Sequence, residues 1–117
     1  MFDSSSRDKS IDPLELVKQV YIMTNYSATH LQVSINDRVS HPNILKAFSE
    51  FQYGFLGLYG LVCIKPEFDN NLKERIKNWK SKDTRGLQPE QFVVFCKKSL
   101  RLYYDFQDHL VHLQVIE

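Results

Sequence analysis

The stretch that decides the fold is residues 42–64, which read PNILKAFSEFQYGFLGLYGLVCI. Its core-type side chains recur at alternating spacings of four and three, which places them on one side of an α-helix. These positions are Ile44, Phe48, Phe51, Phe55, Leu58 and Val62. The last three turns are apolar on nearly every side, as in a helix surrounded by other helices. We therefore expect residues 42–64 to form a central helix of a bundle.

Two further segments carry the same 3,4 alternation, and a shorter one carries a narrow apolar stripe. The positions are Leu14, Val17, Tyr21, Thr24, Ala28, Leu31 and Ile35 in the first segment, Phe68, Leu72, Ile76 and Trp79 in the third, and Phe92, Cys96, Ser99, Tyr103, Phe106, Leu110 and Leu113 in the fourth. The spacing of Leu31, Val33 and Ile35 also fits a strand, but the positions before them favour a helix. Each stripe has to be covered by another apolar surface.

Proline and cap residues set the expected helix boundaries. Asp12 and Pro13 form a typical helix start, and Pro42 and Pro89 lie at similar starts. We predict helices over residues 13–37, 42–64, 67–80 and 89–115, which form an all-α, four-helix antiparallel bundle in one domain over residues 11–117. Residues 1–10 are polar and lack periodicity, so we expect a flexible N-terminal arm.

Three glycines interrupt the apolar second segment. Gly54, Gly57 and Gly60 each cost about 0.8–1 kcal/mol relative to alanine inside a helix. Either the backbone of a neighbouring helix approaches closely at these positions, or the helix bends there.

Composition narrows the class of protein. The chain has 117 residues and a formal net charge of +1, so we expect one domain without a general attraction to nucleic acid or anionic membranes. The longest apolar run, residues 53–64, is shorter than the roughly 20 residues that span a bilayer. With only two cysteines and no apolar signal core at the N-terminus, we expect a cytoplasmic protein.

The fourth segment has a second apolar stripe beside its main one. Two apolar stripes are more than one neighbouring helix covers. Tyrosines, which are enriched at protein interfaces, are also frequent in the second and fourth segments. We therefore predict a homodimer through the second and fourth helices. The predicted interface residues are Tyr53, Leu56, Tyr59, Val93, Leu100, Tyr104 and Val111. On this hypothesis the chain is a non-enzymatic adaptor that also binds an unknown protein partner.

A second hypothesis is an accessory protein that binds nucleic acid through the basic segment 73–85. Its cations are Lys73, Arg75, Lys77, Lys80, Lys82 and Arg85, against two acidic residues. Such clusters attract phosphate backbones, and Trp79 would stack on a base if it were exposed. The alternative is a solvated outer helix with Trp79 in the core.

A third hypothesis is a metal site formed by Asp105, His109 and His112, whose spacings of four and three place them on one helix face. That face is the polar one, so the alternative is a solvated strip with ion pairs between residues four apart, such as Arg101 with Asp105. Cys63 and Cys96 lie in apolar contexts, which keep a thiol inert. We expect no enzymatic activity and no cofactor.

Overall fold

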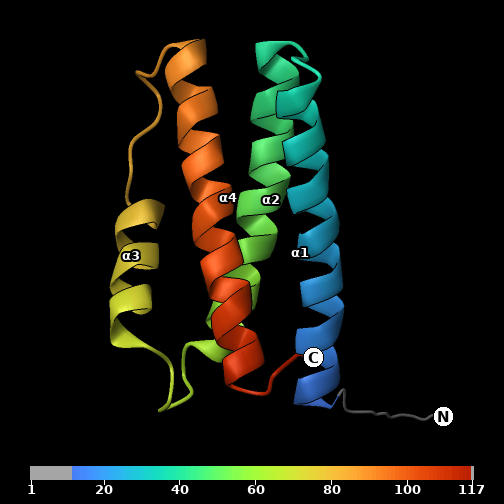
Figure 1. Ribbon diagram of the computed structural model, residues 1–117, viewed down its shortest axis with the longest axis vertical. Coiled ribbons are helices and arrows are strands. Elements are labelled where there is room, and N and C mark those ends of the chain that lie inside the picture. The colour runs from blue at the N-terminus through green and yellow to red at the C-terminus, as the bar shows by residue number, and fades with distance from the viewer. Residues whose placement is uncertain (1–11, 117) are drawn as a thin grey trace, which may run out of the picture.

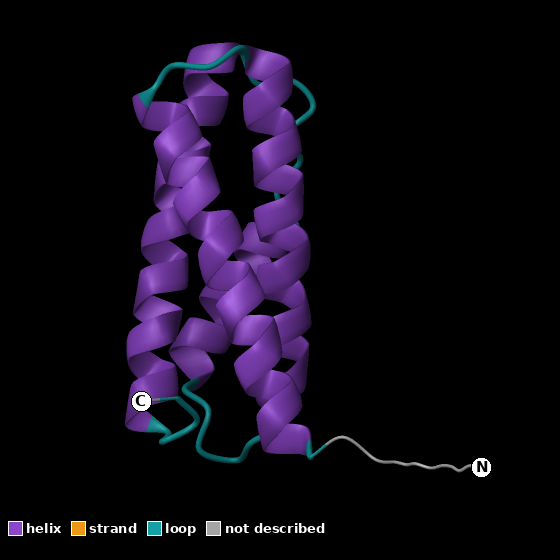
Figure 2. Cartoon of the chain, turned by 90° about the vertical axis from the view of Figure 1, so that its right-hand side faces the viewer, coloured by secondary structure: helices purple, strands orange, loops and turns teal. Residues whose placement is uncertain are grey.

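The computed structural model describes residues 12–116, and these residues form helices and loops without a strand (Figure 2). The helices are α1 (Pro13–Asn36), α2 (His41–Val62), α3 (Asn70–Lys80) and α4 (Pro89–His112). They run alternately up and down, with α1 and α3 on opposite sides of α2 and α4 (Figure 1). The predicted all-α four-helix fold is therefore confirmed. The arm predicted for residues 1–10 lies outside the described residues.

The first two helices begin and end within two residues of their predicted boundaries, whereas the other two differ more. Helix α3 starts at Asn70 rather than 67, because the carboxylate of Asp69 accepts a hydrogen bond from the Leu72 amide at 2.8 Å and caps the helix there. Helix α4 ends at His112 rather than 115, because Gln114 adopts a left-handed φ of 62°. The Val115 amide then donates to the carbonyl of Leu110, which closes the helix end.

The core is an aromatic cluster centred on Phe55. Its ring lies 4.9 Å from that of Trp79, 5.1 Å from that of Tyr103 and 5.0 Å from that of Phe106, between ring centroids. All six stripe positions of α2 and all four of the third segment are buried, as predicted. Leu14, at the start of the first stripe, is wrong as a core residue, since it is 46% exposed in the first turn of α1. Leu113 is only partly buried.

One of the three glycines of α2 lies at a close helix contact. A Cβ atom at Gly54 would lie 2.8 Å from Oγ1 of Thr24 on α1, while a Cβ atom at Gly57 or Gly60 would meet nothing within 4 Å. Thr24 is fully buried and donates from Oγ1 to the Val20 carbonyl at 2.8 Å. Close approach therefore explains Gly54 but not Gly57 or Gly60, which are exposed.

Buried polar groups join the helices in two places. The indole Nε1 of Trp79 donates to Oγ of Ser99 at 2.7 Å, and this links α3 to α4. Between α1 and α4, Asn25 Oδ1 accepts from the Tyr103 hydroxyl and from Nε2 of Gln107. Each contact satisfies polar groups that burial would otherwise leave unpaired, so both contribute to holding the helices together.

Candidate functional site

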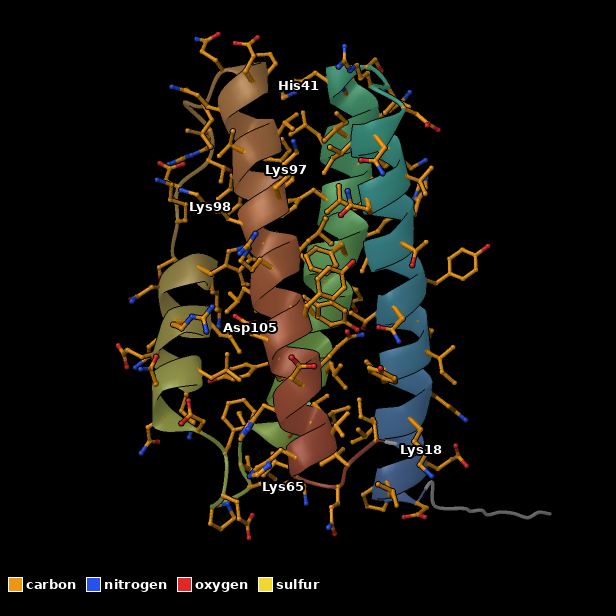
Figure 3. The ribbon with its side chains drawn as sticks, in the orientation of Figure 1. Lys18, His41, Lys65, Lys97, Lys98 and Asp105 are labelled. Carbon is orange, nitrogen blue, oxygen red and sulfur yellow. The ribbon has the colours of Figure 1, made fainter. Side chains whose placement is uncertain are left out.

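The polar face of α4 docks α3 through hydrogen bonds and a ring contact. Asp105 accepts a hydrogen bond from Arg75 of α3 at 2.8 Å, and Nε2 of His109 accepts one from the Asp69 amide at 2.9 Å (Figure 3 labels Asp105). The His109 ring also packs edge-on against Phe68, with centroids 4.9 Å apart. These side chains are engaged in holding the neighbouring helix.

This geometry changes the interpretation of Asp105, His109 and His112. Within residues 12–116 no group of three or more His, Cys, Asp or Glu side chains is placed to hold a metal ion. His112 stacks on His109 with ring centroids 6.2 Å apart, and both line a shallow depression with Asp69 and Asp105. The predicted solvated strip is also wrong in part, because Asp105 pairs with Arg75 rather than with Arg101.

The basic segment is less available to nucleic acid than its sequence indicates. Trp79 is 8% exposed, so it is a core residue and does not stack on a base. Two of the six predicted cations have partners in the chain: Arg75 pairs with Asp105, and Arg85 pairs with Asp83 at 3.0 Å. The other four are Lys73, which is partly buried, and Lys77, Lys80 and Lys82, which are exposed.

The predicted interface residues do not form one exposed surface. Leu100 is 2% exposed and belongs to the core of this chain, so its assignment to a partner interface is wrong. Leu56, Tyr59 and Val93 are partly buried against the core. Tyr53, Tyr104 and Val111 are 85%, 42% and 48% exposed.

The exposed members also lie on different sides of the bundle. Phe51 and Phe55 of α2 face Tyr103 of α4, with ring centroids 5.4 and 5.1 Å from it. Tyr53 is two residues from each phenylalanine, which places it about 200° around α2 and away from α4. One partner surface therefore cannot include both Tyr53 and the exposed face of α4.

A larger apolar surface lies on α1, at residues that the sequence reasoning missed. Opposite the buried side of α1, the exposed fractions are 65% for Ile22, 69% for Met23, 81% for Tyr26 and 47% for Val33. Ile22, Tyr26 and Val33 also border an open depression of about 570 Å³ along this helix. We call Ile22, Met23, Tyr26 and Val33 the α1 outer face. A sequence signal for it exists, because residues 19–36 contain no Asp, Glu, Lys or Arg.

The two cysteines differ in burial. Cys96 is fully buried, and burial raises the pKa of its thiol to about 12. A thiol that stays protonated is a poor nucleophile. Cys63 is partly buried at the end of α2, and its Sγ lies 3.9 Å from the Gly60 carbonyl.

Neither a membrane span nor a relative adds to these observations. Across the described residues, every helix is too short or too polar to cross a bilayer. No protein-family model, curated protein or solved structure shows significant similarity to this chain.

Proposed function

We propose that this protein is a helical interaction module that forms a homodimer by packing the α1 outer face against the same face of a second copy. The observation that carries the proposal is the exposure of Ile22, Met23, Tyr26 and Val33 on one helix face. Large exposed apolar patches mark interaction sites in folded proteins, whereas isolated apolar residues do not. The four residues are close together along α1, spanning about 17 Å at 1.5 Å per residue.

The lack of charge along residues 19–36 favours a second copy as the occupant. A symmetric dimer brings each residue close to its own counterpart, so a charged face would meet like charges. An uncharged face meets none. Burying a charged side chain without a counter-ion is costly, and a dimer formed through two copies of this uncharged face buries no such charge.

Tyr53 of α2 is a further exposed aromatic residue at a similar level of the bundle. Gly54 lies against Thr24, and Nδ1 of His30 lies 3.9 Å from Oε1 of Glu50, so α1 and α2 are antiparallel in a defined register. This register places Tyr53 at the level of Tyr26 and Ser27. A tyrosine buries about 150–250 Å² when covered. Covering Tyr26 together with Ile22 and Met23 supplies part of the roughly 800 Å² per partner of a standard interface.

Sedimentation equilibrium at about 100 μM tests the dimer, and charge substitutions test its surface. We expect a mass twice the 13.8 kDa of one chain. Ile22→Glu buries two like charges without partners and is expected to give a monomer. Val94→Glu is the matched control, since Val94 is 51% exposed on α4. A monomeric native chain, or equal dissociation by both variants, would refute the proposal.

Tyr104→Glu separates this surface from the one predicted on α4. Tyr104 is 42% exposed and does not belong to the α1 outer face. We expect Tyr104→Glu to remain a dimer. A monomer from Tyr104→Glu together with a dimer from Ile22→Glu would assign the interface to α4 instead.

Contact with a nucleic-acid backbone is the second candidate function, and one observation favours it. The hydrogen bond from Trp79 to Ser99 aligns the end of α3 with the middle of α4. Lys80 and Lys98 are the sequence neighbours of this pair, so the exposed cations of both helices flank the contact, and we treat them as one candidate basic patch. Its members are Lys77, Lys80, Lys82, Lys98 and Arg101.

Because Trp79 is buried, this patch would contact phosphates without reading sequence. Binding should therefore weaken steeply as salt concentration rises. A gel-shift assay at low salt with duplex DNA and single-stranded RNA tests it, with Lys80→Ala/Lys98→Ala as the variant. Absence of a shift with either nucleic acid would exclude this function.

A further inference from the structure

A pocket of about 290 Å³ lies at the end of the bundle where the α1–α2 turn meets the first turns of α4. Its apolar lining is Ile35, Val39, Ile44, Pro89 and Val93, and its polar lining is Arg38, His41, Glu90 and Lys97. Figure 3 shows His41 and Lys97 at this end, in the space between α4 and the α1–α2 hairpin. None of the residues of the α1 outer face lines this pocket, whereas its lining residue Lys97 borders a second depression with Arg101 of the basic patch.

The polar lining is dominated by positive charge from three segments. Arg38 comes from the α1–α2 turn, His41 from the start of α2 and Lys97 from α4, against one carboxylate, Glu90. None of the ion pairs found in residues 12–116 includes Arg38, Lys97 or Glu90. Two cationic side chains thus remain available to a ligand in the pocket.

His41 has a hydrogen-bonding group that the chain leaves unused. Its ring packs edge-on against Phe92, with centroids 5.6 Å apart, and its buried Nδ1 atom has no hydrogen-bond partner. Leaving a buried polar atom unpaired costs free energy, so such an atom in a folded protein calls for an explanation. Because Nδ1 is closed off from solvent, a ligand in the pocket reaches it only when the imidazole makes a half-turn about its Cβ–Cγ bond, which exchanges the positions of Nδ1 and Cδ2.

Arg38 occupies a backbone position that favours glycine. Its φ is 55°, and the amides of Arg38 and Val39 donate to the carbonyls of Ile35 and Ser34 at 3.1 and 3.2 Å. This hydrogen-bond pattern closes a helix end, and glycine is the usual residue at its left-handed position. The arginine therefore brings a charged side chain to the pocket at some cost in backbone strain.

We propose that this pocket binds a phosphate monoester, with Arg38, His41 and Lys97 around the phosphate and the organic group on the apolar lining. Donors from three directions suit a tetrahedral oxyanion, and arginine and lysine are the common side chains for phosphate. The starts of α2 and α4 add a positive helix-dipole field at the same end. The apolar lining favours an ester over free phosphate because it offers a surface for an organic group.

Nuclear magnetic resonance titration of the full chain tests the proposal with inorganic phosphate and phenyl phosphate as probes. We expect phenyl phosphate to shift the resonances of Arg38, His41 and Lys97 and to bind more tightly than inorganic phosphate. No shift of these resonances at 10 mM of either probe would overturn the proposal. Equal affinity for the two probes would overturn the assignment of an ester.

Two neighbouring lysines provide a matched pair of variants. Lys97 lines the pocket, whereas Lys98 points to the α3–α4 loop on the other side of α4 (Figure 3). We expect Lys97→Ala to weaken phenyl phosphate binding about tenfold, as for loss of a charge-assisted hydrogen bond, and Lys98→Ala to leave it unchanged. Equal weakening by both variants would indicate general surface attraction and would overturn the pocket.

Two further substitutions separate binding from folding. Arg38→Gly removes the cation while suiting the left-handed backbone, so binding should weaken about tenfold without loss of thermal stability. Glu90→Gln removes the only carboxylate of the pocket and should tighten binding. Unchanged binding in Arg38→Gly, or weaker binding in Glu90→Gln, would contradict the proposed geometry. Ile22→Glu should retain binding, so the dimer and the pocket are tested independently.

Discussion

Replacing each glycine of α2 by alanine tests the helix contact that sets the register of α1. At Gly57 and Gly60, where a Cβ atom meets nothing within 4 Å, alanine should stabilise the protein by about 0.8–1 kcal/mol through helix propensity. At Gly54 the same gain is opposed by a Cβ atom 2.8 Å from Thr24 Oγ1. Overpacking of this kind costs about 1–3 kcal/mol. We therefore expect Gly54→Ala to be less stable than Gly57→Ala by about 1–3 kcal/mol.

Urea unfolding followed by far-ultraviolet circular dichroism measures these differences through the midpoint and slope. For a domain of this size, 1 kcal/mol corresponds to about 4 °C in melting temperature. Gly57→Ala and Gly60→Ala are the matched controls, because they make the same change in the same helix on exposed positions.

Thr24→Ala identifies the contact as the cause. It removes the oxygen 2.8 Å from the new Cβ atom, after which the nearest atoms are Thr24 Cα and Cβ, each 3.4 Å away. The double variant Gly54→Ala/Thr24→Ala should recover at least about 1 kcal/mol relative to the sum of the single changes. If Gly54→Ala is as stable as Gly57→Ala and the coupling is zero, the close approach of α1 and α2 at this position is refuted.

Three further predictions address the contacts of α4. Ser99→Ala leaves the buried Trp79 indole without its acceptor and should lower the unfolding free energy by about 1–3 kcal/mol in urea titrations; no change would contradict the buried bond. His109→Ala removes the acceptor of the Asp69 amide. Amide hydrogen exchange should therefore accelerate across α3 (Asn70–Lys80) and not across α2. Equal acceleration in α2 and α3 would contradict the idea that His109 holds α3 specifically. Burial raises the pKa of Cys96 from 9.0 to about 12. The protonated thiol therefore contributes to the free energy of unfolding below pH 9, and this contribution is lost as the pH rises toward 12. We expect Cys96→Ala to lose less stability than the native chain over this pH range.

Periodicity predicted the helices and their buried sides well because each side-chain direction is a property of its own helix. The stripe Phe68, Leu72, Ile76 and Trp79 is buried as expected, and Trp79 is the clearest case. The start of α3 and the end of α4 were predicted less well, since both depend on local hydrogen bonds: those of the Asp69 cap, and those around the left-handed Gln114.

Exposed interaction surfaces were harder to predict, because the exposure of a side chain depends on which other helices pack against it. Leu100 and Tyr104 belong to the same second stripe of α4, yet Leu100 is 2% exposed and Tyr104 42%. A helical projection ranks both as apolar but does not say how far each is covered by the rest of the bundle. Ile22 and Tyr26 lie opposite the stripe of the first segment, and the interface predicted on the second and fourth segments left this uncharged side of α1 without a prediction.

The sequence by itself determined that this chain is all-α, where its four helices lie and which side of each is buried, because a 3.6-residue repeat converts spacing into direction. Only the tertiary structure decided what contacts the polar faces of the helices and the second apolar stripe of α4. It engaged Asp105 and His109 with α3, buried Leu100, and gathered Arg38, His41 and Lys97 around one pocket. The physical reason is that these outcomes depend on contacts between residues up to 60 positions apart, which no local pattern encodes.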